Sequence, residues 1–199
     1  MTGSRQIDES GSLPLFSSDR ERRLWFWTLL VVAAIYSTLG LASTLAGAIP
    51  DILAAFGFVA GMLLVGATVL TQGLKTKPRG LEIAVGLGIA VVYLMVFLRI
   101  AIPERSHLIE YGVVAVFVYE AITERKSNGR RVYLPALLAI FLTTFIGTLD
   151  EGIQFFLPSR VFDPRDILFN GLAAMMAVAA SFSLNRVRRF VRTKSPSTP

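Results

Sequence analysis

Long apolar blocks, each close to the length that crosses a bilayer, are the feature that most constrains this chain. They cover residues 24–49, 52–74, 81–102, 107–123, 132–156 and 167–187. A transmembrane helix needs about 20 mainly apolar residues, because the hydrocarbon core of a bilayer is about 30 Å thick. Each block is expected to be helical, since backbone groups in lipid must bond within their own segment. The sequence therefore predicts an all-α integral membrane protein, a bundle of about six transmembrane helices.

The blocks are not equally clear. The first ends in Ala46-Gly47-Ala48, which resembles a signal-peptidase site, but it is longer than the 7–15 apolar residues typical of a signal peptide. The fourth block, 107–123, is the shortest and contains Glu110 and Glu120, so the sequence leaves open whether it is a full span. The fifth is apolar only as far as Leu149.

Composition supports a membrane protein and excludes some kinds of site. Hydrophobic residues make up 53% of the chain and charged residues 17%, against about 25% charged residues in soluble domains. The chain has no cysteine, which excludes disulfides and thiolate metal sites, and one histidine, His107, which excludes a multi-histidine site within one chain. We predict no cofactor and assign no metal ligands, and whether a metal binds stays open.

Basic residues orient the predicted helices. They occur before the first block, at 75–79, at 125–131 and from Arg186 onward, and six spans would put all four groups on one side. Cytoplasmic loops carry an excess of Lys and Arg, so both termini are predicted to be cytoplasmic. The net charge of +6 is then a topology signal, and no nucleic-acid partner is expected.

Three regions follow from this topology. Residues 1–23 are predicted to be a disordered cytoplasmic tail, residues 24–187 the transmembrane domain, and residues 188–199 a basic cytoplasmic tail. Within the membrane, Gly57 and Gly61 form a GxxxG pair, and the last block has small residues at Ala173, Ala177 and Ser181. Small residues let helices approach closely, and we favour packing within the chain over a dimer interface.

Polar residues gather at the predicted outer ends of the later helices. His107, Glu110 and Tyr111 share one helical face because they are three and four residues apart. Further polar residues follow at the end of the fifth block and the start of the last: Asp150, Glu151, Gln154, Arg160, Asp163, Asp166 and Asn170. Ionisable residues near a membrane interior are costly and usually face a wet cavity or one another. The sequence therefore predicts a polar site on the outer face.

Individual roles in this site stay open between structure and function. Asp166 is well placed as a helix N-cap. Arg160 can pair with Glu151 or Asp166, or its planar guanidinium can bind an anionic head group. His107 and Tyr111 fit an interhelical network as well as a site. The predicted ligand-binding residues are His107, Tyr111, Glu151, Gln154, Arg160, Asp166 and Asn170.

At these residues the sequence resembles the VanZ-like family of bacterial membrane proteins. The family pattern has a Glu and a Gln three residues apart, then proline and arginine, then acidic residues and an asparagine, with an upstream H-x-x-x-Y element. Its counterparts, within 104–174, are His107, Tyr111, Glu151, Gln154, Pro158, Arg160, Asp163, Asp166 and Asn170. The resemblance implies a place in the bacterial cytoplasmic membrane, a cell-envelope role and an effect on glycopeptide-antibiotic sensitivity.

Three functions fit these residues, and we expect the first. The site would bind an anionic amphiphile, such as a lipid head group, a lipid-linked wall precursor or a lipoglycopeptide. In the second, the protein would be an enzyme that acts on such a lipid. Glu151 or His107 would be the general base and Arg160 would stabilise an oxyanion. A divalent metal bound by Asp150, Glu151 and Asp166 is another possible arrangement. Since no nucleophile motif occurs, catalysis is not favoured. In the third, the chain would be an accessory subunit with a membrane-protein partner.

Overall fold

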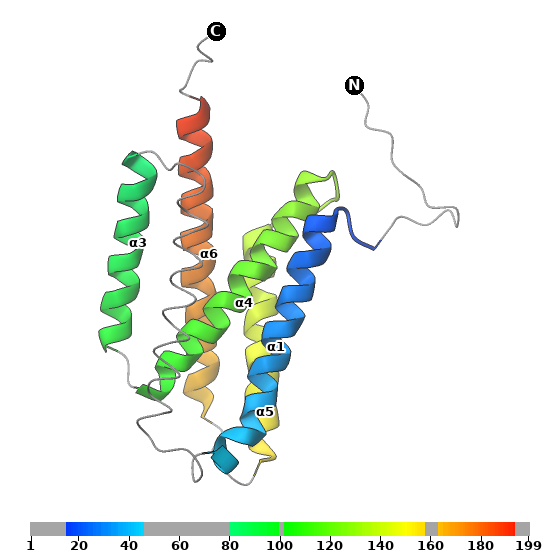
Figure 1. Cartoon of the computed structure of the whole chain (residues 1–199), viewed down its shortest axis with the longest axis vertical. Helices are drawn as coiled ribbons and strands as arrows, with labels where there is room; N and C mark the ends of the chain where they lie inside the picture. Colours follow the sequence, from blue (N-terminus) through cyan, green and yellow to red (C-terminus); the bar gives the residue numbers. More distant parts are fainter. Residues whose placement is uncertain (1–14, 46–79, 100–101, 158–162, 194–199) are drawn as a thin grey trace.

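The computed structural model describes residues 15–45, 80–99, 102–157 and 163–193, and every regular element in these ranges is a helix (Figure 1). The helices are α1 (Asp19–Leu45), α3 (Gly80–Arg99), α4 (Ile102–Ser127), α5 (Pro135–Phe155) and α6 (Pro164–Thr193). The predicted block at 52–74, with Gly57 and Gly61, lies outside the described residues. The all-helical architecture agrees with the prediction from the apolar blocks.

Three of these helices are long and apolar enough to cross a membrane: α3, α5 and residues Pro164–Val191 of α6. Their mean hydropathies are 2.4, 1.6 and 1.8. Large apolar side chains such as Leu87, Leu98 and Phe141 are exposed on their surfaces. A water-soluble protein seldom leaves so much apolar surface in contact with solvent, so these helices support the prediction of a membrane protein.

Helix α4 is the centre of the bundle and contacts α1, α5 and α6 (Figure 1). It has 26 residues, about 39 Å at 1.5 Å per residue, and is therefore longer than the predicted block 107–123. Tyr111, Val114, Ala115 and Val118 are completely buried. Because neighbouring helices, and not lipid, cover α4, it can carry polar residues that lower its hydropathy. This explains why the sequence predicted a membrane span least clearly at the fourth apolar block, 107–123.

The helices run in alternating directions and give the bundle two different ends. Helices α1, α3 and α5 run one way, and α4 and α6 run the other way (Figure 1). One end, here called the basic end, contains Arg20, Arg22, Arg23, Arg125, Lys126, Arg130, Arg131, Arg186, Arg188 and Arg189. The opposite end, here called the acidic end, contains Asp150, Glu151, Asp163 and Asp166.

Ion pairs at the basic end join α1 to α4. Arg125 Nε lies 2.7 Å from Glu21 Oε1, and Arg20 lies 2.8 Å from Glu124 and 3.1 Å from Glu120. Glu21 also takes part in a helix cap, because its backbone N–H donates to Ser18 Oγ while its carboxylate accepts from the backbone N–H of Ser17. Helix α1 therefore begins at Asp19, inside the predicted tail 1–23, and α6 likewise extends to Thr193, inside the predicted tail 188–199.

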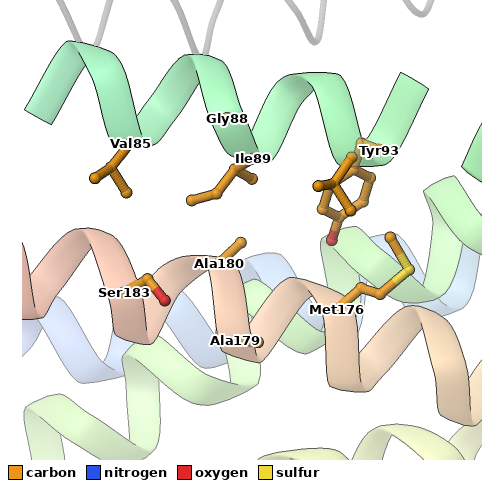
Figure 2. A pocket seen from close by; sticks show the side chains of 9 residues that line it. Val85, Gly88, Ile89, Tyr93, Met176, Ala179, Ala180 and Ser183 are labelled. Atoms are coloured by element: carbon orange, nitrogen blue, oxygen red, sulfur yellow. The ribbon is translucent and has the colours of Figure 1, made fainter. Parts of the chain in front are cut away.

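Helix α3 is packed more loosely than the others. It has no buried residue and contacts mainly α6. Between the two helices lies an apolar cavity of about 400 Å³, bordered by Val85, Ile89, Tyr93 and Met176 (Figure 2). By contrast, Ala173 and Ala177 of α6 are buried within the bundle, as packing within the chain requires.

Candidate binding site at the acidic end

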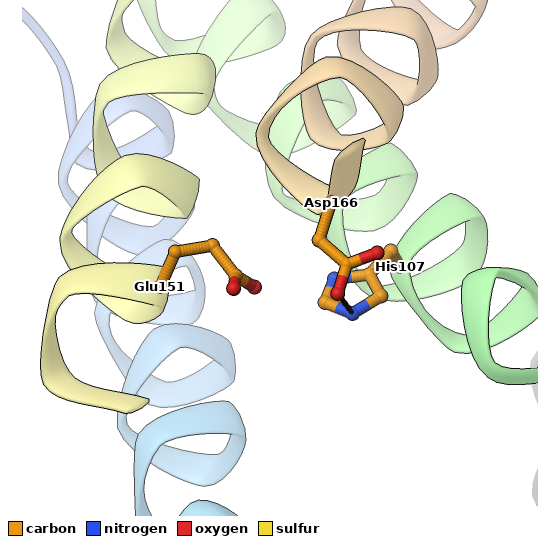
Figure 3. Close-up of side chains that lie close together, drawn as sticks. All are labelled: His107, Glu151 and Asp166. Carbon is orange, nitrogen blue, oxygen red and sulfur yellow. Dashed lines mark ion pairs between the residues drawn. The ribbon is translucent and has the colours of Figure 1, made fainter. Parts of the chain in front are cut away.

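Three helices bring most of the predicted site residues together at the acidic end. His107 comes from the start of α4, Glu151 from the end of α5 and Asp166 from the first turn of α6, and their side chains point toward one another (Figure 3). Tyr111, Gln154 and Asn170 lie beside them on the same helices and are buried. Arg160 lies outside the described residues.

The His107 ring is held between two residues of α6. Its Nδ1 is 3.0 Å from Asn170 Oδ1, and its Nε2 is 3.6 Å from Asp166 Oδ2. An amide oxygen only accepts hydrogen bonds, so in this arrangement Nδ1 carries the hydrogen. In the neutral ring, Nε2 then presents its lone pair toward the Asp166 carboxylate. Two electron-rich atoms face each other there, so a proton or a cation between them would be favourable.

Asn170, which contacts His107, also packs closely against α5 at Gly147. A Cβ atom added at Gly147 would lie 2.6 Å from Asn170 Nδ2 and 2.8 Å from Asn170 Cβ. These distances are shorter than side-chain packing allows, so any larger residue at Gly147 would displace Asn170. Gly147 was not among the predicted site residues, because a glycine within an apolar block gives no local sign of a contact with another helix.

Glu151 is completely buried, and within the described residues only one of its two carboxylate oxygens accepts a hydrogen bond. Gln154 Nε2 donates to Glu151 Oε1 at 3.0 Å and to Asp150 Oδ2 at 3.3 Å. Glu151 Oε2 is buried and makes no hydrogen bond within the described part of the chain. A buried carboxylate oxygen is costly without a partner. A further hydrogen-bond donor or a cation at Oε2 would therefore satisfy this oxygen.

Tyr111 forms one wall of the site. Its ring stacks on the His107 ring, with centroids 6.1 Å apart and planes 8° from parallel, and the residue is completely buried. The two residues are one helical turn apart, as the sequence predicted from their spacing. Together with the contact to Asn170, this stacking restricts rotation of the His107 ring.

The predicted cap at Asp166 is wrong, and the cap is Asp163. Helix α6 begins at Pro164, and Asp163 Oδ1 accepts a hydrogen bond of 2.9 Å from the backbone N–H of Arg165. An N-cap aspartate followed by proline at the first helical position is a common helix start, and the Asp163-Pro164 dipeptide could have identified it. Asp166 is the third residue of α6, in its first turn, where its carboxylate contacts His107 instead.

The described part of the site is electronegative. Asp150, Glu151, Asp163 and Asp166 lie at this end, whereas Arg165 is exposed to solvent. His107, Glu151 and Asp166 each offer a ligand atom, and these three atoms lie within 4.8 Å of one another. Two carboxylates and an imidazole so close together suit the binding of a cation or of hydrogen-bond donors better than the binding of a bare anion.

A second cavity, of about 790 Å³, lies at the basic end. Its border includes Arg125, Arg130 and Arg131, together with Trp25 and Tyr133. It shares no residue with the acidic-end site and offers positive charge in place of negative charge. Any experiment on anionic ligands has to distinguish the two places.

Comparisons with known proteins leave the family assignment as a prediction. No protein-family model, no curated protein and no solved structure matches the chain. The resemblance to the VanZ-like family is therefore carried by the residues quoted above, from His107 to Asn170.

Proposed function

We propose that the chain is a multi-pass cell-envelope membrane protein of the VanZ-like kind, whose acidic-end site binds the polar head of an anionic amphiphile. The observation that carries this proposal is the buried Glu151, whose Oε2 makes no hydrogen bond within the described residues. A lipid head group, a lipid-linked wall precursor or a lipoglycopeptide would supply the missing donor. By binding such molecules, the protein would affect sensitivity to glycopeptide antibiotics.

The charges of the site define the head group further. Carboxylates accept hydrogen bonds from hydroxyl, amide and amine groups, so Glu151 and Asp166 call for donors on the ligand. An anionic group on the same ligand calls for a cation, and we assign this role to Arg160, in the connection between α5 and α6. The expected head group therefore carries an anionic group and several hydrogen-bond donors, as a glycosylated or amino-acid-bearing phosphate does.

Apolar side chains around the site suit the hydrocarbon part of such a ligand. Phe155 and Phe156 are 67% and 82% exposed at the end of α5, and Leu168 is 70% exposed in the first turns of α6. In a membrane these side chains would contact acyl chains beside the polar head. Head and tail of one amphiphile would thus be bound by neighbouring parts of α5 and α6.

The proposed topology has about six spans, both termini in the cytoplasm and the acidic end outside. The arginines of the basic end support this orientation by the positive-inside rule. Helix α1 ends at the acidic end, and α3 begins at the basic end (Figure 1). A further span over 52–74 would connect these two ends. We assign the protein to the bacterial cytoplasmic membrane on the strength of the family resemblance.

Native mass spectrometry of the purified protein tests the proposed function. We expect a co-purified amphiphile on the wild type, and its loss from Glu151→Gln and from Arg160→Ala. Arg131→Ala is the matched control, because Arg131 borders the basic-end cavity. Circular dichroism of each variant verifies that the helices are retained.

The outcomes separate the alternatives. A ligand lost from both acidic-end variants and kept by Arg131→Ala supports the proposal, and its mass identifies the amphiphile. A ligand lost only from Arg131→Ala would move the binding site to the basic end and refute it. If the wild type carries no amphiphile and instead co-purifies with a stoichiometric protein, the accessory-subunit alternative replaces it.

A further inference from the structure

We propose that His107, Glu151 and Asp166, brought together from α4, α5 and α6, form a binding site for one divalent transition-metal cation, of which Zn²⁺ is the best fit. This inference goes beyond the proposed function; it shares the observation on Glu151 Oε2 with that proposal, but a cation can bind whether or not an amphiphile does. It rests on three observations: the convergence of the ligand atoms, the orientation of the imidazole and the unsatisfied oxygen of Glu151.

The first observation is geometric. One ligand atom from each residue lies within 4.8 Å of the other two, and Figure 3 shows the three side chains directed to the space between their helices. Zn²⁺ binds imidazole nitrogen and carboxylate oxygen at about 2.0–2.2 Å, so ligand atoms on one ion lie about 3–4 Å apart. Small side-chain rotations would therefore complete the coordination without a change of the helix packing.

The second observation is the orientation of His107. Asn170 Oδ1 lies 3.0 Å from Nδ1, and with the amide in this orientation Nδ1 is the donor, which leaves Nε2 directed to Asp166. A histidine that binds a metal ion commonly donates its other ring N–H to a carboxylate, a carbonyl or a water molecule. The Asn170 amide oxygen takes that part here, and Tyr111 stacks against the same ring. The imidazole is therefore oriented as a metal ligand before any ion binds.

The third observation is Glu151. The residue is 0% exposed, and its Oε2 makes no hydrogen bond in the described residues, whereas Oε1 is held by Gln154. A buried carboxylate is normally paired or bound to a metal. A cation between Glu151 and Asp166 would offset the repulsion of their charges and supply the missing partner of Oε2.

The donor set indicates the class of metal. Mg²⁺ and Ca²⁺ prefer six or more oxygen ligands, whereas imidazole nitrogen favours Zn²⁺ and its neighbours among the transition metals. One imidazole and two carboxylates supply three ligands, which leaves at least one coordination position for water. The alternative is a protonated His107 that forms an ion pair with Asp166, with no metal bound.

Metal analysis of the full-length protein decides between these two. Protein purified in detergent, with any histidine tag removed, is stripped with a chelator, incubated with ZnCl₂ and desalted, and its zinc is measured by mass spectrometry. We expect one Zn²⁺ per chain, visible absorption bands when Co²⁺ is added to the stripped protein in place of Zn²⁺, and no stoichiometric binding of Mg²⁺. Less than half an equivalent of zinc on the folded wild type would overturn the proposal without any variant.

Variants assign the ligands. Asp166→Asn and Glu151→Gln change little in size, and each should weaken Zn²⁺ binding at least tenfold. Asn170→Ala, which removes the partner of His107 Nδ1, should weaken it about 10- to 100-fold. Asp19→Asn is the control, because Asp19 is an exposed carboxylate at the basic end. Equal zinc affinity in all four variants would refute the assignment of the ligands. That outcome would not change the result of the native mass spectrometry experiment on amphiphile binding.

Discussion

At the scale of single residues, the chemistry of the site depends on how Asn170 holds His107. The amide oxygen at 3.0 Å determines which ring nitrogen carries the hydrogen. The other nitrogen is thereby directed to Asp166, whatever ligand or ion is present. Asn170 is completely buried and contacts α5 at Gly147. A residue that touches no ligand in our proposal therefore determines the orientation of one that does.

Gly147→Ala tests this dependence. The added methyl group would lie 2.6 Å from Asn170 Nδ2, so Asn170 or the helix must shift. Overpacking of this kind costs about 1–3 kcal/mol. We expect a lower melting temperature in detergent and, if zinc binds at His107, weaker zinc binding as well.

Gly152→Ala is the matched control in the same helix. No atom lies within 4 Å of a Cβ at Gly152, and alanine is the better helix former by about 0.5–1 kcal/mol. This variant should be as stable as the wild type or slightly more stable. Equal destabilisation of both variants would show that the contact between Gly147 and Asn170 is unimportant.

At the scale of elements, the start of α1 is a separate stabilising unit. Burial raises the pKa of Glu21, but the hydrogen bonds from Ser17 and the charge of Arg125 outweigh burial, so the pKa lies below its usual value. A carboxyl with a lowered pKa in the folded state adds stability above its unfolded pKa of about 4.5 and loses it as the pH falls further. We expect the melting temperature to decrease as the pH falls below about 4.5.

Glu21→Gln should lower the melting temperature at neutral pH and make it less dependent on acid pH. The substitution keeps the cap, because glutamine can still accept the bond from Ser17, and loss of the ion pair with Arg125 is worth about 1 kcal/mol because the guanidinium is partly exposed. Thermal denaturation of both proteins between about pH 6 and pH 3 measures the difference. An unchanged pH dependence in Glu21→Gln would mean that other carboxylates, such as Glu124, govern the acid transition.

The existence of the helices was predictable from the sequence, but the residues at which they begin and end were predictable only in part. Apolar blocks of about 20 residues predicted α1, α3, α5 and α6, because lipid demands helices of that length and composition. Helix α4 gave a weak signal because protein surrounds it. The start of α1 at Ser18 to Glu21 and the start of α6 at Asp163-Pro164 follow known capping patterns, so both could have been read from the sequence.

The composition of the site was predictable, but its geometry was not. The spacing of His107 and Tyr111, and of Glu151 and Gln154, predicts shared helical faces. Which faces meet depends on how α4, α5 and α6 pack, and that depends on contacts such as Gly147 with Asn170. One sequence contains no pairwise information about such contacts, so the proximity of His107, Glu151 and Asp166 became visible only in three dimensions.

At the scale of the whole molecule, charge is divided between the two ends of the bundle. The glutamates at the basic end are neutralised by arginines, as in the pairs of Glu21 with Arg125 and of Glu82 with Arg188. At the acidic end, His107 is the described basic partner of Asp166. The positive-inside rule places the end that carries the arginines and lysines in the cytoplasm, so the orientation of the bundle in the membrane can be predicted from its basic end.

Single cysteines test that orientation without any background, because the chain has no cysteine of its own. Ser127 is exposed at the end of α4, at the basic end, and Arg165 is exposed in the first turn of α6, at the acidic end. In intact cells, a small membrane-impermeant maleimide should label Arg165→Cys but should label Ser127→Cys only after permeabilisation. The reverse pattern would place the acidic end in the cytoplasm and exclude an outer-leaflet ligand. Labelling of both cysteines in intact cells would mean that α5 does not cross the membrane between them.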